Sequence, residues 1–184
     1  MPKWLEQAAK NDLEVLEDGL CQLCGAETMH GLSECVHAAG HLPHKISLEK
    51  GIQRMTIFLC VDAHALTHMQ IHGRWNNHFH LARLYLILVD RVQWTYEYSS
   101  MLSEVIDAYK VGRDHEFILP IDTAHLPKIT VIEIDAAQDD DDYIAVVWRW
   151  AHEVYAALPA AHPIVANIAN QFIQKVHPQL QTTT

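Results

Sequence analysis

The chain has 184 residues, of which 49% are hydrophobic and 20% charged, a composition typical of one folded globular unit and not of a disordered chain. Its formal net charge of −10 excludes a protein that holds nucleic acid through its overall charge, because a phosphate backbone is bound mainly by Lys and Arg. No apolar run reaches the roughly 20 residues that a membrane helix needs, and the first residues lack the apolar stretch of a secretory signal. We therefore expect a cytoplasmic protein with no membrane partner.

The first elements in chain order are predicted to be a helix and a β-hairpin. Apolar residues recur at helical spacing over residues 3–17 and predict an amphipathic helix. Two short apolar pieces, residues 33–37 and 55–59, flank a segment with Gly and Pro and predict a hairpin with a long connection. Residues 62–72 then predict a helix that ends before Gly73, because glycine is favoured just after a helix C-terminus.

The second half of the chain is predicted to be mainly helical. Apolar residues at spacings of three and four predict one long helix over residues 77–110, with a break near Ser99 and Ser100 as the alternative. Two runs with β-branched residues, 117–119 and 129–134, lie beside prolines and predict strands. The acidic residues 139–142 suit a helix N-terminus, so we expect a helix to begin there and a last helix to cover residues 163–176.

Three cysteines have the spacing of ligands for one metal ion. Cys21 and Cys24 form a CxxC pair, and with Cys60 they supply three thiolates for a tetrahedral structural Zn²⁺ site. The fourth ligand stays open: Cys35 would give a four-thiolate site, whereas His64, one helical turn after Cys60, would give a three-Cys, one-His site. The competing interpretation is that Cys35 and Cys60 are buried as small hydrophobic side chains, as free cysteines often are.

The order of these residues resembles a known family. A CxxC pair, a predicted strand ending in His37, and the segment LCxxxHxxxH with Cys60, His64 and His68 are similar to the HNH (ββα-metal) endonucleases in their zinc-stapled form, common in phages and mobile elements. The resemblance covers residues 18–75. It implies that His37 is the general base, and that His64 and His68 are catalytic residues that hold a Mg²⁺ or Mn²⁺ ion acting on a phosphodiester.

The resemblance also implies a fold and a domain organisation. We expect an α+β, mainly helical protein in which residues 1–76 form an HNH-like zinc module with an N-terminal helix. Residues 77–184 would form a helical extension with a short β-hairpin, packed as one unit with the first part. The predicted function is metal-dependent hydrolysis of nucleic acid, with local contacts to the nucleic-acid substrate.

Three residues differ from this family at chemically demanding positions. Val36 stands before the general base where the family has a metal-binding His or Asp, Met55 stands where an Asn orients the base, and Ala63 replaces a zinc cysteine. The second hypothesis is therefore a catalytically inactive zinc-stabilised binding or inhibitor module of phage or mobile-element origin, which binds a partner protein through an acidic surface. The remaining histidines of this region, such as His72 and His80, are expected to be ordinary surface or core residues.

Overall fold

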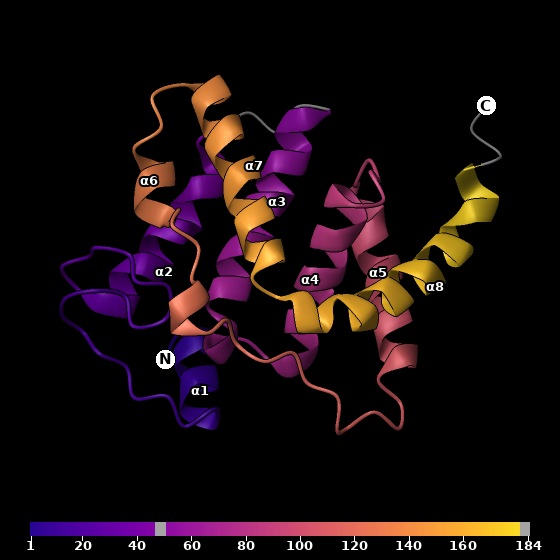
Figure 1. The fold of residues 1–184 in the computed structure, drawn as a ribbon, viewed down its shortest axis with the longest axis horizontal. Coiled ribbons are helices and arrows are strands. Elements are labelled where there is room, and N and C mark those ends of the chain that lie inside the picture. Colours follow the sequence, from indigo (N-terminus) through magenta and orange to yellow (C-terminus); the bar gives the residue numbers. More distant parts are fainter. Residues whose placement is uncertain (47–50, 181–184) are drawn as a thin grey trace.

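The computed structural model describes residues 1–46 and 51–180, and this part of the chain is built from helices (Figure 1). The α-helices are α1 (Lys3–Lys10), α2 (Gly31–His41), α3 (Ile52–Thr67), α4 (Arg74–Leu88), α5 (Tyr96–Tyr109), α6 (Val131–Asp135), α7 (Asp140–Ala156) and α8 (His162–Leu180). Short 3-10 helices are η1 (Leu42–His44), η2 (Met69–Ile71), η3 (Thr123–His125) and η4 (Pro159–Ala161). Within the described residues there is no β-strand, and the one isolated β-bridge joins Gly19 and His30.

The predicted α+β fold with a ββα-metal module is therefore wrong. Residues 33–37 lie in α2 and residues 55–59 lie in α3, while residues 117–119 are irregular and residues 131–134 belong to α6. A short apolar run does not distinguish a buried helix from a strand. Helix α3 is buried over most of its length, so its sequence lacks the polar stripe that would have shown a period of 3.6.

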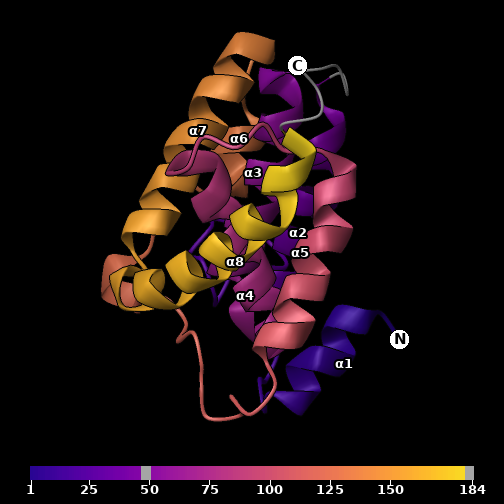
Figure 2. The ribbon, with the colours of Figure 1, turned by 90° about the vertical axis from the view of Figure 1, so that its right-hand side faces the viewer.

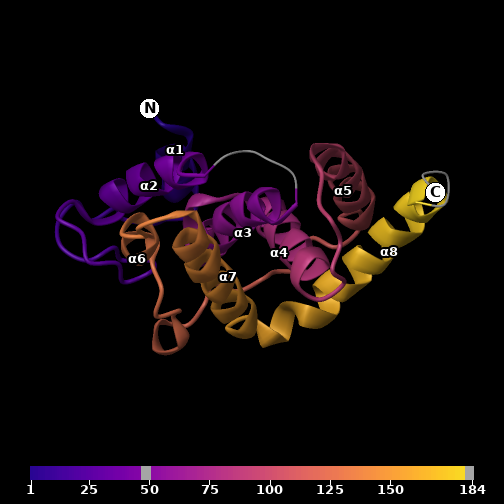
Figure 3. The same cartoon turned by 90° about the horizontal axis from the view of Figure 1, so that it is seen from above.

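Helix α3 lies at the centre of the molecule. It packs against α7 and α4, and α4 packs in turn against α5 and α8. Figures 1 and 3 show α2 and α6 on one side of α3 and α7, with α5 and α8 on the other side, where the C-terminal end of α8 projects away from the N-terminus. Figure 2 shows α8 crossing α4 obliquely. The residue boundary predicted at 76 falls inside α4.

The predicted long helix over residues 77–110 is divided into α4 and α5. Helix α4 ends at Leu88, and the chain turns at Arg91, whose φ of 57° lies in the left-handed region. The turn buries Trp94, whose ring stacks on Phe172 of α8 with the ring centroids 5.3 Å apart. Burial of this aromatic pair anchors α5 and α8 to each other.

The N-terminal helix is shorter than the predicted range of residues 3–17. Helix α1 ends at Lys10, and Asp12 has a φ of 54°, which is incompatible with a continuing helix. The predicted helix over residues 62–72 corresponds to the second half of α3 followed by η2, and Gly73 precedes α4 instead of following a helix.

Two helix starts in the C-terminal part follow from side-chain caps. Helix α7 begins after Asp139, whose carboxylate accepts a hydrogen bond of 2.9 Å from the backbone N–H of Asp142, which confirms the prediction for the acidic run. Helix α6 begins after Thr130, where the Glu133 carboxylate accepts from the Thr130 N–H at 2.7 Å and completes a capping box. This cap explains why a β-branched run forms a helix. The predicted last helix is confirmed as α8.

A buried ion pair connects α3 to α4. The carboxylate of Asp62 accepts hydrogen bonds from Arg83 Nε at 2.9 Å and Nη2 at 2.6 Å, and both side chains are almost fully excluded from solvent. The guanidinium also lies over the rings of Phe58 and Phe79, at 4.8 and 5.1 Å from their centroids.

None of the described helices combines the length and apolar character that crossing a membrane requires.

Candidate metal centre

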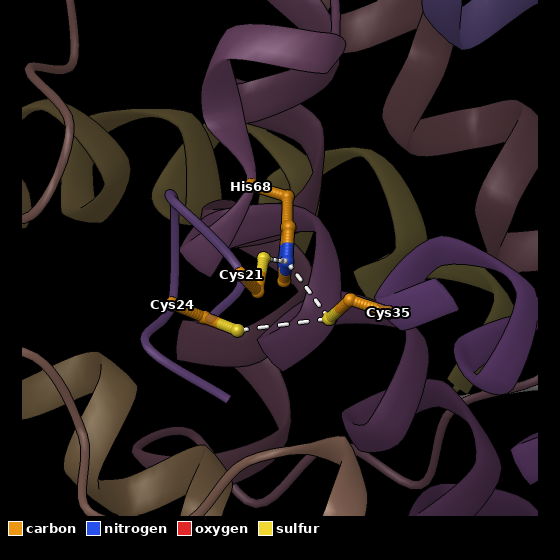
Figure 4. A group of neighbouring side chains, drawn as sticks. All are labelled: Cys21, Cys24, Cys35 and His68. Atoms are coloured by element: carbon orange, nitrogen blue, oxygen red, sulfur yellow. Dashed lines mark hydrogen bonds between the residues drawn. The ribbon is translucent and has the colours of Figure 1, made fainter. Parts of the chain in front are cut away.

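Four buried side chains converge beside the C-terminal end of α3. Figure 4 shows the thiols of Cys21, Cys24 and Cys35 and the imidazole of His68 turned toward one another, with all four ligand atoms within 4.8 Å of each other. The Nε2 atom of His68 lies 3.4 Å from Sγ of Cys21 and 3.2 Å from Sγ of Cys35, and the sulfurs of Cys24 and Cys35 are 3.6 Å apart. These separations are close to the edges of about 3.5–3.8 Å in a tetrahedron of zinc ligands. The cluster can therefore hold one metal ion.

A tight turn presents the first two thiols. The backbone N–H of Gly25 donates to the carbonyl of Cys21 at 2.8 Å, and the N–H of Cys21 donates to the carbonyl of Ala26 at 2.9 Å. Gly25 has a φ of 75°, a conformation that glycine adopts without steric cost. The turn thus brings Cys21 and Cys24 to the same side of a short loop, as the CxxC spacing predicts.

The start of α2 places the third thiol. The Glu34 carboxylate accepts hydrogen bonds from the N–H groups of His30 and Met29, at 2.9 and 2.8 Å, and these bonds lower the pKa of Glu34. Gly31 begins the helix with a φ of 55°, and a Cβ atom there would lie 2.3 Å from the carbonyl oxygen of Leu16. The backbone around Gly31 therefore fixes the entry of α2, and Cys35 one turn later lies in the cluster.

His68 follows directly after α3 and is oriented by that helix. Its Nδ1–H donates to the backbone carbonyl of His64 at 2.8 Å, so that Nε2 faces the three sulfurs. Ligating histidines are usually held in this way by a hydrogen bond from the other ring nitrogen. The ring of His64 stacks on the ring of His68, with centroids 4.0 Å apart, and restricts its orientation.

The electrostatics of the cluster favour a cation. Burial opposes a charge on His68, but the hydrogen bonds and negative charges of Cys21 and Cys24 outweigh it and raise its pKa to about 10. Hydrogen bonds with Cys24 and Cys35 lower the pKa of the Cys21 thiol. Hydrogen bonds with Cys21 and Cys24, together with burial, raise the pKa of the Cys35 thiol. A bound cation would replace the protons that these groups share, because cysteine ligands bind metal as thiolates and a histidine ligand binds it as neutral imidazole.

The structure brings together three of the predicted ligands and leaves out two. Cys21, Cys24 and Cys35 lie in the cluster, whereas Cys60 and His64 do not. Cys60 is 2% exposed in α3, and burial raises the pKa of its thiol to about 11. It contacts Tyr143 of α7, and the cysteine behaves as the small buried hydrophobe of the competing interpretation.

The three predicted catalytic histidines do not share one site. His68 belongs to the cysteine cluster, His64 stacks beside it, and His37 is exposed on α2 two residues after Cys35. Because successive helix residues are about 100° apart, His37 lies on the face of α2 opposite Cys35. Its Nε2 atom is 3.3 Å from Nε2 of His41. The role of His37 as a general base stays a prediction.

The sequence was also compared with known proteins. Residues 19–159 match a family of unknown function, DUF5946, and this range includes all four residues of the cluster. Comparison with curated proteins and with solved structures gave no significant match. The matched range covers most of the chain. The chain therefore belongs to the family of unknown function DUF5946.

Proposed function

We propose that the protein is a zinc-stabilised helical binding module in which the metal has a structural role. The observation that supports this most is the closed ligand set, because four buried protein side chains surround the position of the ion. Structural zinc sites use four protein ligands, whereas catalytic zinc sites keep one position for water or substrate. Three thiolates and one imidazole also match the ligand preference of zinc more closely than that of Mg²⁺ or Mn²⁺.

The origin of the ligands explains what a structural ion would do. They come from the turn at Cys21 and Cys24, from α2 and from the residue after α3, three segments separated in the sequence. Residues 13–30 form no α-helix or strand, so few backbone hydrogen bonds hold them in place. An ion at the cluster would fasten this segment to the central helix, and its binding energy would contribute to folding.

Two features favour a binding role over catalysis. The protein carries a large negative charge, and four protein ligands leave no position on the ion for water or substrate. A net charge of −10 gives the surface a negative field, which favours association with a basic partner and disfavours nucleic acid. The nuclease hypothesis required His64 and His68 to hold a catalytic ion opposite His37. Because Nε2 of His68 faces the cysteine sulfurs, His68 is not available as a ligand of that catalytic ion.

Metal analysis of the purified protein tests the structural site. We expect one zinc per chain in the wild type, and loss of that zinc in Cys35→Ala and in His68→Ala. The matched control is Cys60→Ala, which removes a buried thiol of the same helical region that lies outside the cluster. Zinc retained in Cys35→Ala but lost in Cys60→Ala would contradict the assignment of the ligands.

A cleavage assay separates the two functions. The zinc-loaded protein, given Mg²⁺ or Mn²⁺ with DNA or RNA, is expected to cleave no more than the His37→Ala variant does. A binding module instead predicts a stoichiometric partner whose association weakens as the salt concentration rises. Metal-dependent cleavage that disappears in His37→Ala would overturn the proposal and support the nuclease hypothesis.

A further inference from the structure

Two exposed histidines of α2 lie one helical turn apart. His37 and His41 are four residues apart, so their side chains lie on the same face of the helix, one above the other. Both residues are exposed, and neither belongs to the cysteine cluster. The pair is therefore a separate feature of the protein surface.

The two rings converge at their Nε2 atoms. The ring centroids of His37 and His41 are 4.7 Å apart, with the ring planes inclined at 74°, whereas the two Nε2 atoms are only 3.3 Å apart. This decrease is larger than one imidazole ring could give by itself, so both rings turn their Nε2 atoms inward. The two nitrogens thus face a common point between the rings.

The distance between these nitrogens suits two ligands of one metal ion. Imidazole nitrogens bind Zn²⁺ at about 2.0–2.1 Å, so two of them on a tetrahedral ion lie about 3.3–3.4 Å apart. Without an ion, the same separation lets the N–H of one neutral ring donate to Nε2 of the other, which holds the rings in this arrangement. Two histidines at i and i+4 on one helical face are a recurrent arrangement for binding zinc.

We propose that His37 and His41 together bind one exchangeable divalent transition-metal ion on the surface of α2. Imidazole ligands suit Zn²⁺, Ni²⁺ and Cu²⁺, whereas Mg²⁺ and Ca²⁺ favour oxygen ligands. The net charge of −10 adds an attraction for cations. Two protein ligands leave at least two coordination positions for water or for a side chain of another molecule, in contrast to the four protein ligands of the cysteine cluster. The ion at the pair therefore exchanges with the solution more readily than the structural ion.

Calorimetric titration of the purified protein with Ni²⁺ tests this site. We expect one Ni²⁺ per chain to bind, with the zinc content unchanged and without the near-ultraviolet absorption of nickel thiolates. The absence of that absorption excludes exchange into the cysteine cluster. His37→Ala and His41→Ala should each weaken Ni²⁺ binding about tenfold or more, because one imidazole alone lacks the second, intramolecular contact. Both positions are exposed and alanine favours a helix, so both variants are expected to fold, which circular dichroism checks.

His152 supplies the matched control. It is exposed on α7, and the residues one turn before and after it are Trp148 and Ala156, so it has no histidine partner on its own helix. His152→Ala should leave the affinity and stoichiometry of Ni²⁺ binding unchanged, and paramagnetic broadening of NMR signals by Ni²⁺ should begin in α2 and spare α7.

Three results would each overturn the proposal: no saturable Ni²⁺ binding, unchanged affinity in the His37 and His41 variants, or an equal loss of affinity in His152→Ala. The zinc content of the same samples is measured separately. Failure of the histidine pair is therefore distinguished from failure of the structural zinc site.

Discussion

Gly31 is the residue on which the position of Cys35 depends most directly. Its φ is 55°, and an added Cβ would lie 2.3 Å from the backbone oxygen of Leu16, a contact that no rotamer change can relieve. We expect Gly31→Ala to lower the free energy of unfolding by about 2 kcal/mol or more, through left-handed strain and this clash. Zinc affinity should fall with it, because the start of α2 moves. Denaturant unfolding and a competition assay with a zinc chelator measure the two effects.

Gly40 offers the matched control in the same helix. No atom lies within 4 Å of the position its Cβ would take, and its φ is not in the left-handed region. Because alanine loses less entropy than glycine in a helix, Gly40→Ala should leave stability unchanged or raise it by up to about 1 kcal/mol. If Gly31→Ala and Gly40→Ala lowered the free energy of unfolding equally, the loss would come from any substitution in α2, and not from the backbone conformation of Gly31.

At this scale the sequence predicted the local part of the site and missed the rest. Cys21 and Cys24 were predicted because a CxxC turn is a local structure whose geometry follows from its spacing. Cys35 remained one of two alternatives for the fourth ligand. His68 was assigned to a catalytic ion, because its true environment depends on where α3 ends and on how that end meets α2, which no spacing rule contains.

At the scale of elements, a buried ion pair joins α3 to α4. Asp62→Ala would leave the guanidinium of Arg83 buried without its carboxylate, and we expect a loss of about 3–5 kcal/mol in unfolding free energy. Asp107→Ala is the matched control, because its pair with Lys110 is exposed, and such pairs contribute about 0–1 kcal/mol. Urea unfolding of both variants makes the comparison; similar losses would mean that burial of the pair is not what matters.

The elements that the sequence predicted well are those with a local signal. Helix α7 was predicted from its acidic cap, and α8 from the prolines at 159 and 163 that separate it from α7. The strands were predicted wrongly where tertiary burial hides the helical period, as in α3, or where a capping box overrides β-branched residues, as at Thr130. The break between α4 and α5 depends on the left-handed backbone conformation of Arg91, which cannot be predicted from the sequence because arginine rarely adopts it.

For the whole molecule, the metal and the helical core are expected to stabilise different parts. The cluster joins residues 21–35 to the end of α3, whereas α4, α5 and α8 share an apolar core that includes Trp94 and Phe172. Removal of zinc by a chelator should therefore abolish backbone hydrogen-exchange protection in α2 and the CxxC turn, and leave protection in α4, α5 and α8 largely unchanged. The different response follows because α4, α5 and α8 supply none of the four residues of the cluster.

Hydrogen exchange with mass spectrometry, with and without chelator, measures this difference segment by segment. The Cys60→Ala variant should give the same pattern as the wild type, because its thiol lies outside the cluster. In Cys35→Ala, the metal-free pattern should appear without chelator. Uniform loss of protection across α4, α5 and α8 would contradict this prediction, because it would mean that the helical core unfolds when the ion is removed. Protection of α2 that persists without the ion would instead show that apolar packing alone, through Leu32 and its neighbours, holds α2 on the molecule.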